Sequence, residues 1–377
     1  MKILFNRPTF AGNELKYIQA AFDNGKLSGD GEFTKKCSSF MEDRFSAPKV
    51  LLTTSGTHAL DMAAMLLNLQ EGDEIIVPSY TFSSTANAFI LRGAVPIFID
   101  IRADTLNINE DLIEEKITPK TKAIFIVHYA GIGCEMDKIK EIANKHKLPI
   151  VEDAAQGVNA KYKDKYLGTI GDLGIYSFHE TKNYSCGEGG ALVINNSKFI
   201  ERAEILREKG TDRSKFFRGE VNKYGWVDMG SSYLPSEILA AVLYAQLEKI
   251  SEIQKKRGAI FKFYYDNLKS LEQEKKIILP TTPAHTSSNY HMFYIILPDE
   301  QTRNKLMDYL KSSGILAVFH YLPLHSSKMG KTFGYKNGEL PITEALSARL
   351  LRLPFYSDLK KDELKYIIKT IKQFFQT

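Results

Sequence analysis

The chain has 377 residues, enough for a large domain and a smaller second one. Hydrophobic residues make up 44% and charged residues 25% of the sequence, which is ordinary for a globular protein. The net charge of +5 is spread along the chain without a long basic run, so it gives no support to nucleic-acid binding. No stretch approaches about 18 uncharged apolar residues, so no membrane span is predicted.

Three cysteines, Cys37, Cys134 and Cys186, lie far apart in the sequence. Their spacing fits neither a disulfide framework nor a metal site, which indicates a reducing compartment. The apolar part of the amino terminus is too short for a signal peptide. We therefore expect a cytoplasmic protein.

Short apolar runs alternate with helical patterns from about residue 50 to residue 200. Several runs are apolar throughout rather than alternately, as expected for strands covered on both faces. The pattern predicts an α/β fold with a largely parallel, doubly wound sheet. Strands are expected at 74–77, 95–99, 123–127, 149–151, 174–178 and 191–194, with helices at 56–69, 83–92 and 136–147.

After Trp226 the pattern changes. A long helix is expected over 235–269, with Pro235 in its first turn. Together these features predict a large domain over residues 1–245 and a smaller α+β domain over residues 246–377. Further strands are expected at 292–297 and 317–321, and further helices at 301–312 and 361–375.

Lys182 follows the apolar run 174–178 and precedes Gly-Glu-Gly-Gly at 187–190. An amine held there could form a Schiff base with pyridoxal phosphate (PLP), although a loop lysine taken alone is more often a surface residue. Asp153 ends an earlier apolar run and is expected at the carboxyl edge of the sheet, where ligands bind. A carboxylate there would keep the pyridine nitrogen of PLP protonated, or it would simply cap a helix.

Other polar and aromatic residues follow the expected strands. Ser55, Gly56 and Thr57 form a small polar turn before a helix, suited either to a phosphate or to ordinary capping. Ser177 could add a hydroxyl to such a phosphate site or bond a neighbouring strand. The remaining candidates are Phe82, which would stack on the pyridine ring or pack in the core, and Gln156, which would contact the phenolic oxygen of PLP or lie in a polar loop.

A segment near the carboxyl end contains two histidines and a tyrosine, His320, Tyr321 and His325, and histidines are common metal ligands. Two histidines five residues apart with no third ligand nearby make a poor zinc site. No metal is expected. The segment is interpreted either as a substrate contact or as a structural feature.

These motifs together resemble the nucleotide-sugar aminotransferases, which are PLP enzymes of fold type I with an aspartate-aminotransferase-like architecture. The resemblance runs over nearly the whole chain, from residue 25 to residue 354. It is carried by Thr-Thr-Ser-Gly-Thr at 53–57, Pro-Ser-Tyr-Thr-Phe at 78–82, Glu-Asp-Ala-Ala-Gln at 152–156, Ser-Phe-His-Glu-Thr-Lys-Asn at 177–183 and Gly-Glu-Gly-Gly at 187–190.

The resemblance implies a role for each residue. Lys182 would form the Schiff base, Asp153 would hold the pyridine nitrogen, Gln156 would contact the ring oxygen, and Phe82 would stack. Ser55, Gly56, Thr57 and Ser177 would hold the phosphate. A homodimer with its active sites at the subunit interface is also implied. Many members carry Asn where this chain has the shorter Ser232, at the position that reaches the phosphate of the neighbouring subunit.

The resemblance further implies the reaction. L-glutamate would give its amino group to the cofactor and leave as 2-oxoglutarate, and the amino group would pass to C4 of dTDP-4-dehydro-6-deoxyglucose for cell-surface glycan biosynthesis. Lys182 would move the protons as general acid and base. The alternatives are C3 or C4 transfer to another dTDP- or UDP-linked keto sugar, and a non-catalytic nucleotide-sugar binding protein. A Rossmann dehydrogenase is disfavoured because its glycine fingerprint is missing.

Overall fold

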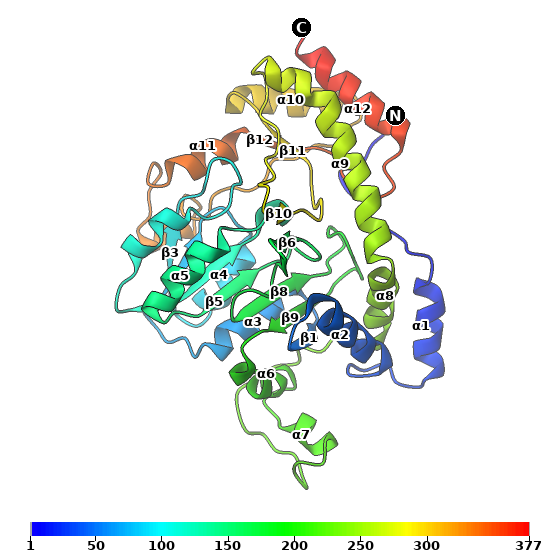
Figure 1. Cartoon of the computed structure of the whole chain (residues 1–377), viewed down its shortest axis with the longest axis vertical. Helices are drawn as coiled ribbons and strands as arrows, with labels where there is room; N and C mark the ends of the chain where they lie inside the picture. Colours follow the sequence, from blue (N-terminus) through cyan, green and yellow to red (C-terminus); the bar gives the residue numbers. More distant parts are fainter. Residues whose placement is uncertain (1, 377) are drawn as a thin grey trace.

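The computed structural model describes residues 2–376, which are built around a seven-stranded sheet (Figure 1). The strand order is β1-β9-β8-β5-β4-β2-β3. Strand β9 is antiparallel to both β1 and β8, and the other neighbouring strands are parallel. The expected α/β fold with a largely parallel sheet is confirmed. The strands are β1 (Lys49–Thr53), β2 (Glu74–Pro78), β3 (Val95–Ile99), β4 (Thr121–Val127), β5 (Ile150–Asp153), β8 (Leu173–Ser177) and β9 (Gly190–Ile194).

Helices cover both faces of this sheet, which explains why its strands are apolar throughout. Successive side chains of a strand point to opposite faces; Val50 and Leu52 pack in one apolar cluster and Leu51 in the other. The first cluster contains residues of α2 (Glu32–Phe45), α5 (Met136–His146) and α8 (Glu237–Glu248). The second contains residues of α3 (Gly56–Leu66), α4 (Ser83–Ile90) and α6 (Ile200–Arg207).

A separate apolar core lies in the carboxyl-terminal part, beside the upper end of α9 in Figure 1. Ile253 on α9 packs in the first core and Ile260 in this one, so the two cores meet within α9. Ile3 also joins this core, through a bridge to Ile315. The two-domain division at 245/246 stays a prediction. The elements here are α9 (Ile250–Gln273), α10 (Glu300–Ser312), α12 (Lys361–Phe374), β11 (Tyr294–Ile296) and β12 (Leu350–Arg352).

Two expected elements differ from the structure. The helix expected over 235–269 is two helices, α8 and α9, that meet at Lys249. Pro235 precedes the capping residue Ser236 and does not lie in the first turn. The strand expected at 317–321 is reduced to one bridge between Val318 and Arg352, because His320 and Tyr321 turn into a cluster of aromatic side chains.

The remaining elements connect these layers. Helices α1, α2, α6, α7 and α11 were not predicted, and strand β1 was expected only as the strand before the turn at 55–57, without bounds. Among residues 2–376, no helix is long and apolar enough to cross a membrane. The elements not yet given are α1 (Glu14–Asp23), α7 (Arg213–Phe217), α11 (Pro341–Arg349), β6 (Lys161–Tyr162), β7 (Lys165–Tyr166), β10 (Thr286–Ser287) and the 3₁₀ turns Glu110–Leu112, Glu114–Lys116, Tyr129–Gly131, Ser197–Phe199 and Gly330–Phe333.

Candidate active site

Lys182 lies in a closed loop between the antiparallel strands β8 and β9. The amide of Phe178 donates to the carbonyl of Gly189 at 2.8 Å, and the amide of Glu180 donates to Gly187 at 2.9 Å. The amide of Lys182 itself donates to the carbonyl of His179 at 2.9 Å. The loop is therefore held by backbone hydrogen bonds, and it fixes the lysine at the carboxyl edge of β8.

The Lys182 amine occupies an environment that disfavours its charged form. Burial lowers its pKa to about 8, the Asp153 carboxylate opposes that shift, and the Arg352 guanidinium adds to it. Asp153 is the last residue of β5, which is paired in parallel with β8. Parallel pairing brings the ends of both strands to the same edge of the sheet, so the amine and the carboxylate meet there as expected. Near neutral pH an amine of this kind is a usable nucleophile and proton carrier.

Asp153 is only 6% exposed, and hydrogen bonds fix its carboxylate. Thr85 Oγ1 donates to one oxygen at 2.7 Å, and the amide of Ala155 donates to the other at 3.1 Å. A further bond of 2.8 Å joins Thr85 Oγ1 to Thr81 Oγ1. Donors of this kind stabilise the ionised carboxylate. Asp153 is therefore suited to hold a proton on a ring nitrogen rather than to act as a simple helix cap.

The amino terminus of α3 forms the expected polar turn beside Ser177. Ser55 caps this helix, because its Oγ accepts from the amide of His58 at 3.1 Å. A Cβ added to Gly56 would lie 3.0 Å from the Cβ of Ser177, so only glycine lets the helix end approach that strand closely. Thr57 Oγ1 lies 2.8 Å from Ser84 Oγ. The turn thus presents free amides, a positive dipole end and hydroxyls, which together suit a phosphate.

Tyr321 connects two of the other candidates. The Gln156 side chain donates to its hydroxyl at 3.3 Å and accepts from the amide of Ala130 at 2.7 Å. The Phe82 ring lies 6.0 Å from the Tyr321 ring and is 58% exposed, so it offers a free apolar face to a flat ligand rather than packing in the core. Burial raises the pKa of Tyr321 to about 12, which keeps its hydroxyl protonated.

The two histidines of this segment have different surroundings. His320 lies beside the site; its Nδ1 is 3.0 Å from the Tyr129 hydroxyl, and burial lowers its pKa well below the usual value. His325 is fully buried, with one ring nitrogen 2.6 Å from Ser79 Oγ and the other 2.9 Å from Glu344. Since both nitrogens of His325 contact protein groups, the structure favours its structural role over a substrate contact.

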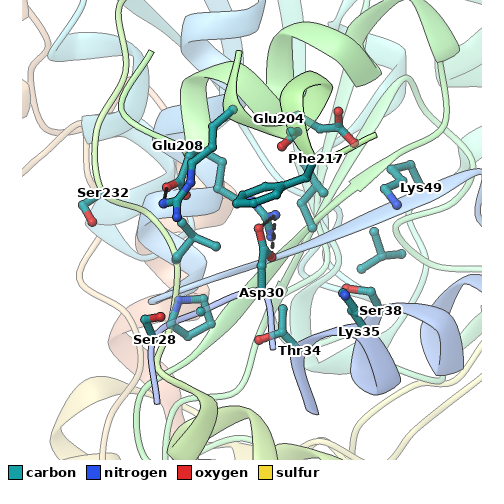
Figure 2. Close-up of a pocket in the computed structure, with 18 of the residues that line it drawn as sticks. Ser28, Asp30, Thr34, Lys35, Ser38, Lys49, Glu204, Glu208, Phe217 and Ser232 are labelled. Atoms are coloured by element: carbon teal, nitrogen blue, oxygen red, sulfur yellow. Dashed lines mark hydrogen bonds and ion pairs between the residues drawn. The ribbon is translucent and has the colours of Figure 1, made fainter. Parts of the chain in front are cut away.

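Ser232 lies apart from the other candidates. It lines a second cavity of about 870 Å³, and Lys182 does not line that cavity. Figure 2 shows Ser232 at the left of this cavity, Glu208 and Glu204 along the top, Asp30 and Thr34 in the lower centre, and Lys49 and Lys35 at the right. Within one subunit, Ser232 is therefore not brought to the Lys182 site. The cavity is rich in cationic side chains, namely Lys26, Lys35, Lys49, Arg207, Lys209, Arg213 and Arg218.

Several residues at the site were missed from the sequence. His291 Nδ1 donates to the side-chain oxygen of Asn183 at 2.9 Å, and both residues line a small hollow beside Lys182. The Tyr129 ring lies 6.4 Å from the Tyr321 ring, and Arg352 acts electrostatically on the pKa of both Tyr321 and Lys182. Only Arg352 gave a signal, as a charge inside the apolar run 350–355. Across residues 2–376, no three His, Cys, Asp or Glu side chains are grouped so as to hold a metal ion.

These residues fit pyridoxal phosphate. The fit rests on a half-buried amine with a lowered pKa, a buried carboxylate held by donors, an exposed aromatic ring, and a helix amino terminus rich in hydroxyls.

Comparisons with known proteins agree with the site. Residues 8–372 match the family model of the DegT/DnrJ/EryC1/StrS aminotransferases. The chain is 32% identical over 373 residues to GDP-perosamine synthase of Escherichia coli O157:H7, covering 98% of this chain and 97% of that protein. The aminotransferase TlmJ of Streptoalloteichus hindustanus has 27% identity and a TM-score of 0.92, covering 100% of this chain and 99% of its own.

A third relative has been solved with the cofactor. The sugar aminotransferase Spr1654 of Streptococcus pneumoniae, in its PLP form, has 25% identity and a TM-score of 0.91, covering 100% of this chain and 99% of its own. This chain belongs to the DegT/DnrJ/EryC1/StrS aminotransferase family. It is a PLP-dependent sugar aminotransferase of fold type I.

Proposed function

We propose that this enzyme transfers the amino group of L-glutamate to C4 of dTDP-4-dehydro-6-deoxy-D-glucose. The products are dTDP-4-amino-4,6-dideoxy-D-galactose, for cell-surface glycan biosynthesis, and 2-oxoglutarate. The observation that carries amino transfer is the Lys182 amine, whose pKa is lowered to about 8 beside the buried Asp153. The choice of sugar rests on the resemblance in segments 127–131, 178–184, 230–234 and 317–321.

Lys182 and Asp153 divide the chemical work in this proposal. PLP, when bound, supplies an electron-withdrawing ring that stabilises negative charge on the carbon that loses a proton. Lys182 removes that proton from the amino donor and returns one to the sugar in the second half-reaction. Asp153, fixed by Thr85 and the amide of Ala155, keeps the ring nitrogen protonated throughout.

The remaining residues hold and orient the cofactor. Ser55, Gly56 and Thr57 would bind its phosphate at the amino terminus of α3, with Ser177 beside them. Phe82 would stack on one face of the cofactor ring, because its own side chain is exposed and free to make that contact. Gln156 would contact the ring oxygen and at the same time fix Tyr321, which with His320 faces the substrate.

We further propose a homodimer in which each subunit completes the site of the other. The place of Ser232 supports this, because it lines a cavity that excludes the Lys182 of its own subunit. Five of the cations that line that cavity are paired with carboxylates. Lys26 and Lys35 make no ion pair among residues 2–376, and these two lysines would meet an anionic group such as a nucleotide diphosphate. The name of the GDP-perosamine synthase refers to a GDP-linked product. This agrees with the proposal that the present enzyme acts on a nucleotide-linked sugar.

The experiment is to incubate the PLP-loaded enzyme with L-glutamate and dTDP-4-dehydro-6-deoxyglucose and to identify the product by mass spectrometry and proton NMR. We expect an amino sugar with an axial amine at C4. Lys182→Ala should lower the rate by about 10³-fold or more, since it removes the general acid and base.

The matched control is Lys165→Ala, an exposed lysine of β7, which should retain full activity. An equatorial amine would refute the galacto product. Turnover with a UDP-linked or 3-keto sugar, and none with the dTDP-linked 4-keto sugar, would refute the proposed acceptor while leaving the amino transfer intact.

A further inference from the structure

Asn183, the residue next to Lys182, is held at both ends of its side-chain amide by the carboxyl-terminal part of the chain. It is 4% exposed. Its Nδ2 donates to the carbonyl of Asn289 at 2.8 Å, and its Oδ1 accepts from Nδ1 of His291 at 2.9 Å. These partners lie 106 and 108 residues further along the sequence. A buried amide with both ends bonded has one orientation, so a distant segment fixes the neighbour of the lysine.

The same bonds fix the proton of His291. The side-chain oxygen of Asn183 can only accept, so Nδ1 of His291 carries the hydrogen. Burial lowers the pKa of His291 well below the usual value, and the charge of Lys182 adds to this shift. The imidazole is therefore neutral, and it contributes one directed hydrogen bond to the site rather than a charge.

Asn289 joins the loop of Lys182 to the loop of Gln156. It is 1% exposed, and its Nδ2 donates to the carbonyls of Gln156 at 2.8 Å and Val158 at 2.9 Å. Its own carbonyl is the one that accepts from Asn183. All five residues line one small hollow. Asn289 therefore sets the spacing between the loop that bears the amine and the loop assigned to the ring oxygen of the cofactor.

Helix α9 supports the segment that carries Asn289 and His291. Arg257 on this helix is 2% exposed. Its Nε donates to the carbonyl of Tyr290 at 3.0 Å, and its Nη2 donates to the carbonyl of His291 at 2.6 Å. The backbone directly after Asn289 is thus attached to the helix in which the two apolar cores meet. The contacts to Asn183 therefore come from a segment that is itself fixed.

We propose that Asn183, Asn289 and His291 form a clamp that positions Lys182 for proton transfer. The three are positioning residues, because they act on the loop that carries the lysine and on the loop of Gln156. A displacement of about 1 Å at a reacting group can cost on the order of 100-fold in rate. This inference rests on the proposed role of Lys182 as the proton carrier.

The polar character of the clamp favours positioning over simple packing. A buried polar group loses its bonds to water, and its hydrogen bonds inside the protein do little more than replace them. Apolar side chains of the same shape would hold this junction equally well but would not fix its orientation. Since the Lys182 side chain is long and flexible, a fixed starting point restricts where its amine can lie.

The test compares His291→Phe, which removes the donor but keeps a ring, with His291→Gln, which keeps a donor. Single turnovers of the PLP-loaded enzyme with L-glutamate give the rate and the dissociation constant separately. In His291→Phe the rate should fall by about 30- to 100-fold, and the dissociation constant should change by less than about 2-fold. His291→Gln should recover at least about 10-fold of that loss.

Asn183→Ala removes the same hydrogen bond from the other side and gives a second variant where His291→Phe does not fold. The double variant with His291→Phe should be slower than the slower single variant by less than about 2-fold, because both changes break one interaction.

A second readout needs no turnover. The cofactor-free enzyme is labelled with acetic anhydride over a range of pH, and mass spectrometry gives the extent of labelling at Lys182. In the wild-type enzyme the labelling should follow the pKa of about 8. In His291→Phe the amine gains freedom and water, so its pKa should rise by about one unit or more toward the value of a free lysine, whereas His291→Gln should stay near the wild type.

Tyr264→Phe is the matched control for a purely structural loss. Tyr264 is fully buried on α9, and its hydroxyl donates to the carbonyl of Pro354 at 2.9 Å. This change also removes one buried hydrogen bond. It should lower the melting temperature yet leave both the rate and the pKa of Lys182 as in the wild-type enzyme. Melting temperatures of all variants show which of them fold.

Three outcomes would remove the clamp. A rate in His291→Phe within about 2-fold of wild type excludes a positioning role. Equal losses in His291→Phe and His291→Gln show that the hydrogen bond is not the cause. Labelling of Lys182 that is unchanged in His291→Phe makes His291 a structural residue. If the wild-type enzyme converts no L-glutamate, the proposed donor is wrong, but the labelling still decides for or against the clamp, which separates the two failures.

Discussion

The fold holds the Lys182 amine where its charge is disfavoured. Burial and Arg352 act against the ammonium form, and Asp153 alone supports it. In an unfolded chain the same amine has a pKa of about 10.4, so folding shifts the lysine toward the neutral form that amino transfer uses. Reactivity and stability are therefore opposed at this one residue.

Replacement of Lys182 by Met is expected to stabilise the cofactor-free enzyme near neutral pH, raising its melting temperature by about 1–3 °C. Below a pH of about 8 the native lysine is charged in both the folded and the unfolded chain, and its buried charge costs stability. Between about pH 8 and pH 10.4 only the unfolded chain keeps the proton, so wild-type stability rises with pH and the advantage of Met fades. Thermal denaturation across this range measures the effect. Lys165→Met should show no such trend, and a pH-independent gain would contradict the lowered pKa.

One buried carboxylate joins helices α2 and α8. Glu237, on the first turn of α8, is 2% exposed and accepts from the amides of Gly31, Phe33 and Thr34 at 3.0, 2.7 and 3.1 Å. These amides lie at the amino terminus of α2, where backbone N–H groups have no hydrogen-bond acceptor within the helix. A Cβ added to Gly31 would lie 2.4 Å from the Glu237 carboxyl carbon, so glycine is required for this approach.

Glu237→Gln is expected to lower the free energy of unfolding by about 2–4 kcal/mol. The amide is of similar size but carries no charge, and its NH₂ group faces amides that also donate. Urea denaturation of the PLP-loaded enzyme gives the measurement. Glu252→Gln, an exposed position on α9, is the control and should change stability by less than about 0.5 kcal/mol. Equal stability of the two variants would show that this carboxylate does not hold α2.

At the scale of the whole molecule, α7 and the loop after it extend away from the sheet, at the bottom of Figure 1. Large apolar side chains of this segment are exposed to solvent: Trp226 is 82% exposed, Phe217 70% and Met229 58%. Large exposed apolar side chains gathered on one segment are typical of an interaction surface. Ser232 comes soon after Met229 in the sequence and lines the second cavity. The segment therefore connects these exposed apolar side chains to that cavity.

Trp226→Asp is expected to weaken the proposed homodimer, because a buried Trp at an interface typically contributes about 2–4 kcal/mol. Sedimentation velocity across a range of protein concentrations should show a dimer for the wild-type enzyme and a larger monomer fraction for the variant. Leu91→Asp, an equally open position at the end of α4, provides the control. A wild-type enzyme that is monomeric at all concentrations would remove the two-subunit site from the proposal.

The order of strands and turns along the sequence was enough to predict the central part of this site. Lys182, Asp153, Ser177 and the turn at 55–57 all follow strands whose apolar runs are visible in the sequence, and parallel strands bring such ends to one edge. The strand before the turn at 55–57, β1, was expected without bounds, because a short apolar run does not fix where a strand begins and ends. The prediction of one helix over 235–269 was wrong at Lys249, because residues of high helix propensity lie on both sides of the break.

Only the tertiary structure decided which distant residues join that edge. Arg352 and His291 come from the carboxyl-terminal part of the chain, and no periodicity links them to Lys182. His325 lies close in sequence to His320, yet its two ring nitrogens are taken by Ser79 and Glu344. Sequence spacing fixes neighbours along one element, whereas the contacts between elements depend on how two separate cores pack together.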